Sequence, residues 1–208
     1  HHLHRSDAEL PRFFGFLLLF MASMVGLVMA QDMILLFVFW DLTAIASFYL
    51  IGYDRDDPES RSSAMMALLV TGITAIFVLI GVLILRRETG TFSLPDIIAT
   101  PGTNQAMGLG LALIALGALA KSAQVPFHFW LPKAMAAPTP VSAYLHSAAM
   151  VAAGVFLIGR FDPLIDRYDW MTQALLVIGV ASMVVGGILA LTRDVLKQVL
   201  AYSTISQY

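Results

Sequence analysis

Long apolar runs separated by short polar stretches cover most of the chain. The runs occupy residues 13–30, 33–52, 64–85, 106–125, 141–159, 171–191 and 196–208, the last being the start of a further run. Most of them are close to the roughly 20 residues that a helix needs to cross the hydrocarbon core of a membrane. The pattern therefore predicts an all-α, polytopic bundle of transmembrane helices, which we treat as a single domain over residues 1–208.

One of these runs is broken where the others are continuous. Between Lys121 and the next apolar run lie four of the nine prolines of the chain: Pro126, Pro132, Pro138 and Pro140. The intervening residues 127–136 stay apolar and aromatic, so the chain does not cleanly leave the membrane. Irregular backbone survives at membrane depth only where protein or water covers it. We therefore predict a broken helix, 106–125 followed by 127–136, inside the bundle.

Composition narrows the class of protein further. Of the 208 residues, 59% are hydrophobic and only 12% are charged, which is too apolar for a soluble domain of this size. The net charge of −2 gives no basic surface for nucleic acid. There is no cysteine, and the histidines and aspartates lack the spacing of metal ligands, so we expect no metal site and no bound cofactor.

The two ends of the sequence indicate whether the chain is part of a longer protein, and the charges in its loops indicate its orientation across the membrane. The chain opens HHLHRSD and stops inside an apolar pattern, so we interpret it as an interior piece of a longer protein, with His1, His2 and His4 in a solvated loop over residues 1–12. Lysine and arginine are more frequent in one alternating set of loops, which we assign to the cytoplasmic side of the cell membrane. That set carries Arg5, Arg12, Arg55, Arg61, Lys133, Arg193 and Lys197.

Two ionisable residues stand out inside the apolar runs. Asp41 lies near the centre of its run, where a charge costs roughly 2.5–3.5 kcal/mol on insertion scales. Lys121 ends an apolar run without a clear exit to water. A carboxylate about 5 Å from such a lysine, at an effective dielectric near 20, would couple to it by roughly 3 kcal/mol. Moving that carboxylate or its charge would load and unload the lysine, which is the physical basis of a proton switch.

Histidines supply a continuation of this path. His146 lies a few residues into the run that follows the proline-rich connector, and a histidine can pass a proton because it has two ring nitrogens and titrates near neutral pH. A lone histidine in a bundle is more often a hydrogen-bonding residue, but Lys121 lies across the same connector. His128 and Lys197 are secondary candidates for the proton path; interfacial packing and cytoplasmic anchoring are their structural alternatives.

Several segments together resemble a known family. KSAQVPFHFWLPKAMAAPTPVSAYLHSAAMVAAGVFLIGR resembles the most characteristic part of the antiporter-like membrane subunits of respiratory complex I, Mrp-type cation/proton antiporters and membrane-bound hydrogenases. FFGFLLLFMASMVGLV, FVFWDLTAIASFYLIGY and LKQVLAYSTISQ are similar to that family in the expected order. The resemblance is best to the large type, the A-type subunit of Mrp antiporters and its complex I counterpart. It implies that the chain is a fragment of an inverted-repeat transporter fold, from the fourth helix to the start of the tenth.

The resemblance also implies roles for individual residues. It makes Lys121 the central proton-carrying lysine on the broken helix, and His146 the relay histidine of the next helix. Asp41 falls where the family usually has a glutamate, which keeps the charge and shortens the side chain by one methylene. Ala152 stands where Mrp-type proteins often carry a lysine, which leaves complex I-like and hydrogenase-like relatives open.

The function predicted from these observations is proton translocation by an antiporter-like subunit of a multisubunit complex, first as the A-type subunit of an Mrp-type Na⁺/H⁺ antiporter. The alternative is a proton-pumping subunit of a complex I-like oxidoreductase or a membrane-bound hydrogenase. The chain has no catalytic site of its own, so any redox chemistry would belong to other subunits. The expected partners are those membrane subunits, protons, Na⁺ in the antiporter version, and lipid. A structural subunit that moves nothing, or an inactive relative recruited to bicarbonate or CO₂ uptake, remains a competing interpretation.

Overall fold

A computed structural model of the chain describes residues 9–208, and every described element is helical. The helices of membrane length are α1 (Glu9–Met29), α2 (Met33–Ile51), α3 (Pro58–Thr89) and α9 (Asp169–Leu191). A further span is continuous through α7 (Thr139–Val141), a π-helical segment η2 (Ser142–Ala149) and α8 (Met150–Ile165). The remaining elements are α4 (Leu94–Ala99), α5 (Gln105–Lys121), the 3₁₀ turn η1 (Phe127–Phe129), α6 (Trp130–Ala134) and α10 (Leu196–Gln207).

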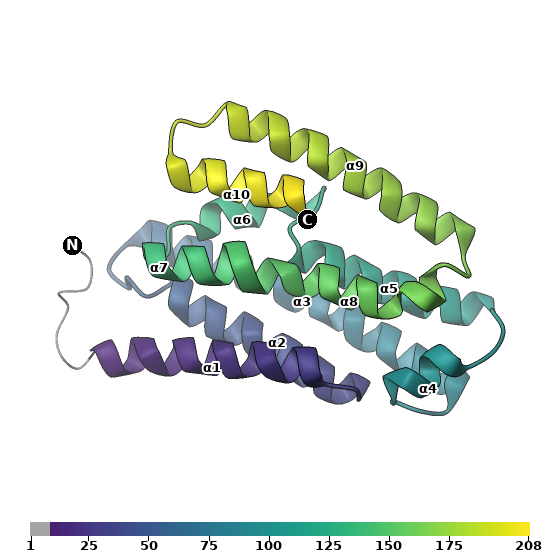
Figure 1. Cartoon of the computed structure of the whole chain (residues 1–208). Helices are drawn as coiled ribbons and strands as arrows, with labels where there is room; N and C mark the ends of the chain where they lie inside the picture. The colour runs from purple at the N-terminus through teal and green to yellow at the C-terminus, as the bar shows by residue number, and fades with distance from the viewer. Residues whose placement is uncertain (1–8) are drawn as a thin grey trace.

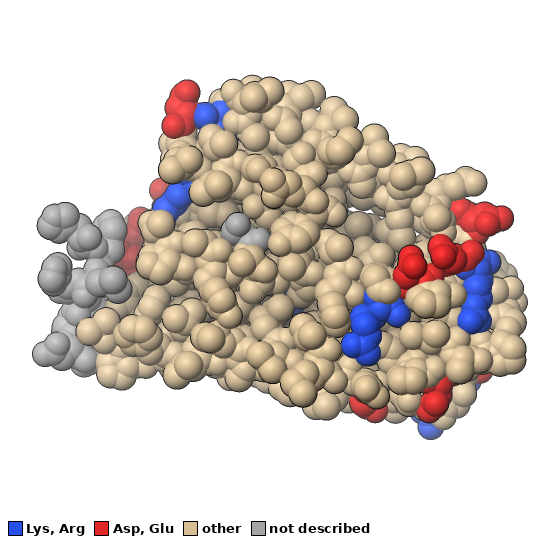
Figure 2. Space-filling view, in the orientation of Figure 1, with Lys and Arg blue, Asp and Glu red and all other residues tan. Residues whose placement is uncertain are grey.

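These helices form one bundle with an outer pair. Helices α1, α2, α3, α5 and α8 run alongside one another, and α9 and α10 lie together on one side of that group (Figure 1). In the face shown in Figure 2, charged residues gather at the two ends of the molecule and the band between them carries almost none. Five of the described helical spans are long and apolar enough to cross a membrane. The prediction of an all-α bundle is confirmed for the described residues, and these spans have the length and apolar composition of membrane-crossing helices.

Helix boundaries differ from the apolar runs where polar residues cap the helices. Residues 1–8, which include the three histidines predicted to lie in a solvated loop, fall outside the described residues, and α1 already begins at Glu9. The apolar run 64–85 is only the middle of α3. That helix starts after Asp57, whose carboxylate accepts from the backbone amides of Glu59 and Ser60, and it ends at Gly90 with a φ of +79°. Because the ends of α3 are polar, the position of an apolar run does not predict where such a capped helix begins and ends.

Hydrogen bonds between loops place three connections at one end of the bundle. These are the α1–α2 turn, the segment around α4 between α3 and α5, and the loop after α8. The turn between α1 and α2 pairs with the segment before α4, through Met33 N to Phe92 O at 2.9 Å and Leu94 N to Gln31 O at 2.8 Å. Arg167, after α8, donates to the carbonyls of Ile98 and Thr100 at the end of α4. These loops therefore lie together, as alternation across a membrane requires; their assignment to the non-cytoplasmic side stays a prediction.

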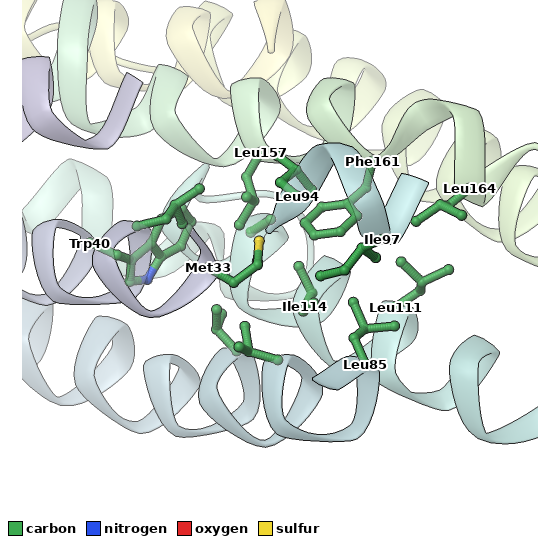
Figure 3. Close-up of a cluster of buried hydrophobic side chains, with 14 of the residues drawn as sticks. Met33, Trp40, Leu85, Leu94, Ile97, Leu111, Ile114, Leu157, Phe161 and Leu164 are labelled. Atoms are coloured by element: carbon green, nitrogen blue, oxygen red, sulfur yellow. The ribbon is translucent and has the colours of Figure 1, made fainter. Parts of the chain in front are cut away.

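Two apolar clusters fill the interior. One is built mainly from α2, α3, α4, α5 and α8, and Figure 3 shows its side chains converging between these helices. It also includes Leu27 of α1 and Met171 of α9. The second joins α1, α2, α3, the connector, η2, the start of α8 and α10. The end of α5 lies between them, because Ala118 belongs to the first cluster and Ala123 to the second. Any polar group at the end of α5 is thus enclosed by apolar packing on both sides.

Glycines bring α5 close to its neighbours. A Cβ on Gly117 would meet Val78 and the Thr74 carbonyl of α3, and a Cβ on Gly154 of α8 would collide with the Ala118 carbonyl and Ser122 Oγ. Small residues allow helix backbones to approach in this way in membranes. The position of the end of α5 is therefore set by direct backbone contact with α3 and α8.

We expect Gly154→Ala to lower the stability of the folded protein by about 1–3 kcal/mol, because the added methyl group forces α8 away from α5. Gly159→Ala is the matched control, since a Cβ at Gly159 on the same helix meets nothing within 4 Å. Thermal denaturation of the purified full-length protein in detergent measures the difference. Equal melting temperatures for the two variants would contradict this packing.

Candidate functional site

The candidate site begins where α5 stops, at Lys121. The amide of Ala123 donates to the Ala120 carbonyl at 3.1 Å, and the amide of Gln124 donates to the Leu119 carbonyl at 2.9 Å. This pair of bonds is a Schellman C-cap, and it requires a left-handed residue, here Ala123 with φ of +51°. Sequence patterning predicts a first segment over 106–125, whereas the capped helix ends four residues earlier. The second segment is also shorter than 127–136 and consists of η1 and α6.

Protein groups cover the irregular backbone after Lys121. Ser182 Oγ on α9 accepts from the Val125 amide at 2.9 Å, and Ser122 Oγ donates to the Val151 carbonyl of α8 at 2.7 Å. Gln124 Nε2 donates to the carbonyls of Ser122 and Ile205 at 3.1 and 3.3 Å. Helices α8, α9 and α10 therefore satisfy the break, which is the condition for irregular backbone in a membrane.

The side chain of Lys121 is fully buried and points to the middle of α2. Its Nζ donates to the Trp40 carbonyl at 2.7 Å and to Thr43 Oγ1 at 2.6 Å. The same nitrogen lies 4.2 Å from the centroid of the Trp40 ring, a cation–π contact. A lysine this deep is held by hydrogen bonds rather than by an exit to water, so its side chain does not snorkel to the membrane surface.

Asp41 lies on the same turn of α2 as the Lys121 contacts and is half-buried. Its carboxylate is close enough to act electrostatically on the Lys121 ammonium. Among the described side chains, Asp41 forms no hydrogen bond or ion pair with Lys121; the direct contacts are those of Trp40 and Thr43. Asp41 and Lys121 are thus electrostatic neighbours that do not form a direct ion pair.

His146 lies across the connector from Lys121, in the π-helical segment η2. It is fully buried, and neither ring nitrogen has a hydrogen-bond partner among the described residues. Buried polar atoms nearly always have partners, and π-helical turns are frequent at functional sites. Trp130 connects the two residues, because its ring packs edge-on against His146 at 6.2 Å and its Nε1 donates to the Ala120 carbonyl at 2.9 Å.

The two secondary candidates occupy the edge of this region. His128 is half-buried in η1, and its Nδ1 has no partner among the described residues. Lys197 of α10 donates to the carbonyls of Ala137 and Met135 at 2.9 and 3.4 Å. Lys197 therefore connects α10 to the backbone of the connector, which is a structural contact.

Sequence reasoning assigned no special role to the two buried tryptophans. Trp40 and Trp130 are at most 1% exposed, so they lie in the bundle rather than at a membrane interface, whereas Trp170 is 54% exposed. A signal was available, since Trp40 and Thr43 are three residues apart and share one face of α2, but nothing in the sequence says that this face meets Lys121.

Comparison with known proteins identifies the family. Residues 30–208 match the family described as "NADH:quinone oxidoreductase/Mrp antiporter, TM", and the chain belongs to it. The resemblance found in the sequence is thereby confirmed. In this family assignment the chain is a membrane subunit of the antiporter-like type.

Individual relatives refine the comparison. The chain is 47% identical over 209 residues to the antiporter subunit mnhA2 of Staphylococcus epidermidis, covering 99% of this chain and 26% of that protein. It is 46% identical over 206 residues to the A/B subunit of a K⁺/H⁺ antiporter of Rhizobium meliloti, covering 96% of this chain and 20% of the relative. The chain therefore spans about a fifth to a quarter of the length of these curated relatives.

Solved structures agree with the sequence comparison. A chain of the Mrp complex from Dietzia sp. superposes with a TM-score of 0.88 at 44% identity, covering 93% of this chain and 22% of that one. A chain of an archaeal membrane-bound sulfane sulfur reductase gives a TM-score of 0.86 at 28% identity, covering 92% of this chain and 40% of that one. Both neighbours belong to multisubunit membrane complexes.

Proposed function

We propose that this chain forms the proton-carrying part of the A-type subunit of an Mrp-type antiporter, which exchanges protons for Na⁺ or K⁺ across the cell membrane within a complex of membrane subunits. The observation that carries the proposal is the fully buried Lys121, held at the end of a broken helix beside Asp41. Identities of 44–47% to Mrp-type and K⁺/H⁺ antiporter chains support this version.

The proposed mechanism uses the contacts around Lys121. A lysine amine can carry one proton, and its charge is stabilised here by the Trp40 carbonyl, Thr43 and the nearby Asp41 carboxylate. Any change in the Asp41–Lys121 separation alters how strongly the proton is held, because their Coulomb energy scales inversely with distance and is little screened away from water. Proton loading and release by Lys121 would follow that change.

His146 is the proposed acceptor beyond Lys121. It lies past Trp130 on the other side of the connector, with both ring nitrogens available to bond a proton carrier. A neutral imidazole can accept a proton on one nitrogen and release one from the other. The proposed line thus runs from Asp41 through Lys121 to His146, with His128 and Lys197 at its edge.

The runner-up is a proton-pumping subunit driven by redox chemistry in partner subunits. It is favoured by the similarity to a chain of the archaeal sulfane sulfur reductase, a respiratory membrane complex. The identity of 28% to that chain, against 44% to the Mrp complex chain, ranks it second. In both versions the residues of this chain would perform the same proton transfer.

Everted membrane vesicles containing the full-length protein in its assembled complex test the function. We expect addition of Na⁺ or K⁺ to dissipate an imposed pH gradient, read with a pH-sensitive dye, and vesicles from a strain lacking the gene to give no such response. A complex that assembles normally but gives no cation-dependent or redox-dependent proton movement would instead support the structural-subunit interpretation.

A further inference from the structure

The ammonium of Lys121 is hydrogen-bonded to two neutral groups of α2 and not to the charged side chain of Asp41. Its Nζ contacts the Trp40 carbonyl at 2.7 Å and Thr43 Oγ1 at 2.6 Å. Two of the three N–H donors of the lysine are therefore used by uncharged oxygens. Among the described side chains, the Asp41 carboxylate accepts neither of these two hydrogen bonds from Lys121.

The hydroxyl of Thr43 is oriented for this task. Thr43 Oγ1 lies 2.7 Å from the Trp40 carbonyl, so its hydrogen points along α2 to that oxygen and its lone pairs remain for Lys121. Thr43 is also fully buried and has restricted side-chain rotation because it is β-branched. The threonine is therefore a fixed acceptor at the position where the ammonium lies.

Helix geometry separates the two neutral groups from Asp41. Trp40 and Thr43 are three residues apart and lie on one face of α2, whereas Thr43 and Asp41 are two residues apart and point away from each other. Thr43 and Asp41 therefore lie on different faces of α2, and the ammonium is hydrogen-bonded on the Thr43 face. The lysine stem is flexible, so rotation of its side-chain bonds would change the distance between the ammonium and Asp41.

We propose that Thr43 is a positioning residue for proton transfer: with the Trp40 carbonyl it gives the charged Lys121 a neutral resting place away from Asp41. This inference rests on the proposed function. Without such a place, an ammonium that moved away from Asp41 would lose both its counter-charge and its hydrogen bonds in the buried interior of the bundle. With it, Lys121 exchanges a charged partner for a neutral one and stays solvated by protein.

The test compares Thr43→Val with Thr43→Ser in the full-length protein within its complex. Valine keeps the shape and removes the acceptor, so we expect the maximal rate of proton transport to fall about tenfold, the typical effect of losing a hydrogen bond to a charged group. The apparent KM for the transported cation should stay unchanged. Serine restores the hydroxyl and should restore most of the rate.

Thr71→Val is the matched control. Thr71 on α3 is also buried, but among the described residues its Oγ1 bonds to no group other than the Ala67 carbonyl of its own helix. If Thr43→Val does not assemble, Thr43→Ala removes the hydroxyl without adding a methyl group and is expected to give the same loss. Lys121→Ala, measured alongside, shows separately whether the proposed function holds.

The outcomes are distinct. Loss in Thr43→Val with recovery in Thr43→Ser and normal rates in Thr71→Val supports the positioning role. Wild-type rates in Thr43→Val, with an inactive Lys121→Ala, would remove Thr43 from the mechanism and leave the proposed function standing. Equal losses in Thr43→Val, Thr43→Ser and Thr71→Val would reduce Thr43 to a packing residue and overturn the inference. An active Lys121→Ala would instead reject the proposed function.

Discussion

Replacing Lys121 by alanine is expected to abolish proton transport while leaving the complex assembled. The substitution removes a fully buried amine that carries the proton in the proposed path, and no other described lysine or arginine side chain bonds to Trp40 and Thr43. Arginine at the same position should also be inactive, because a guanidinium keeps its proton at all accessible pH values. Dye-monitored proton movement in everted vesicles measures both variants.

The control for this prediction is Lys133→Ala. Lys133 belongs to α6 in the same connector but is exposed, so its loss should leave transport near the wild-type rate. The arginine variant distinguishes a residue that releases a proton from one that only supplies a fixed positive charge. Wild-type transport with arginine at position 121 would mean that a fixed positive charge suffices and that the residue does not release a proton.

Replacing Asp41 by asparagine is expected to reduce transport by up to roughly a hundredfold. A carboxylate about 5 Å from an ammonium contributes roughly 3 kcal/mol at an effective dielectric near 20, and each 1.4 kcal/mol is a factor of ten. Asparagine keeps the volume and removes the charge that acts on Lys121. The same vesicle assay, normalised to the amount of assembled complex, measures the rate.

Two further variants define what Asp41 contributes. Asp41→Glu should retain transport, because the charge is kept and the longer side chain can still approach Lys121. Asp194→Asn, at an exposed site before α10, should have no effect. A normal rate in Asp41→Asn would show that the charge of Asp41 does not govern Lys121.

The apolar runs predicted most of the fold because the membrane imposes length and composition on its helices. Residues 33–52 and 171–191 became α2 and α9 with changes of one or two residues. Polar capped ends were missed, as in α3, and so was α4, whose six residues lie in a connector rich in glycine and proline. Capping depends on a few side-chain contacts that hydropathy does not register.

The sequence predicted which residues form the candidate site, but it did not predict which groups they contact. Buried charge is costly, so Asp41, Lys121 and His146 were visible as exceptions in apolar runs. That Lys121 bonds to Trp40 and Thr43, about 80 positions earlier in the chain, depends on how α5 crosses α2. The left-handed Ala123 and the π-helical segment around His146 likewise have no local sequence signal.

The most direct measurement follows the side-chain nitrogen of Lys121 itself. In the full-length complex labelled with ¹⁵Nζ-lysine, the Lys121 resonance is assigned by its absence in Lys121→Arg and recorded by solid-state NMR across the pH range in which the vesicles transport protons. The account predicts that this resonance changes from ammonium to neutral amine within that range. A resonance that stays an ammonium throughout, while transport proceeds, would contradict proton carriage by Lys121.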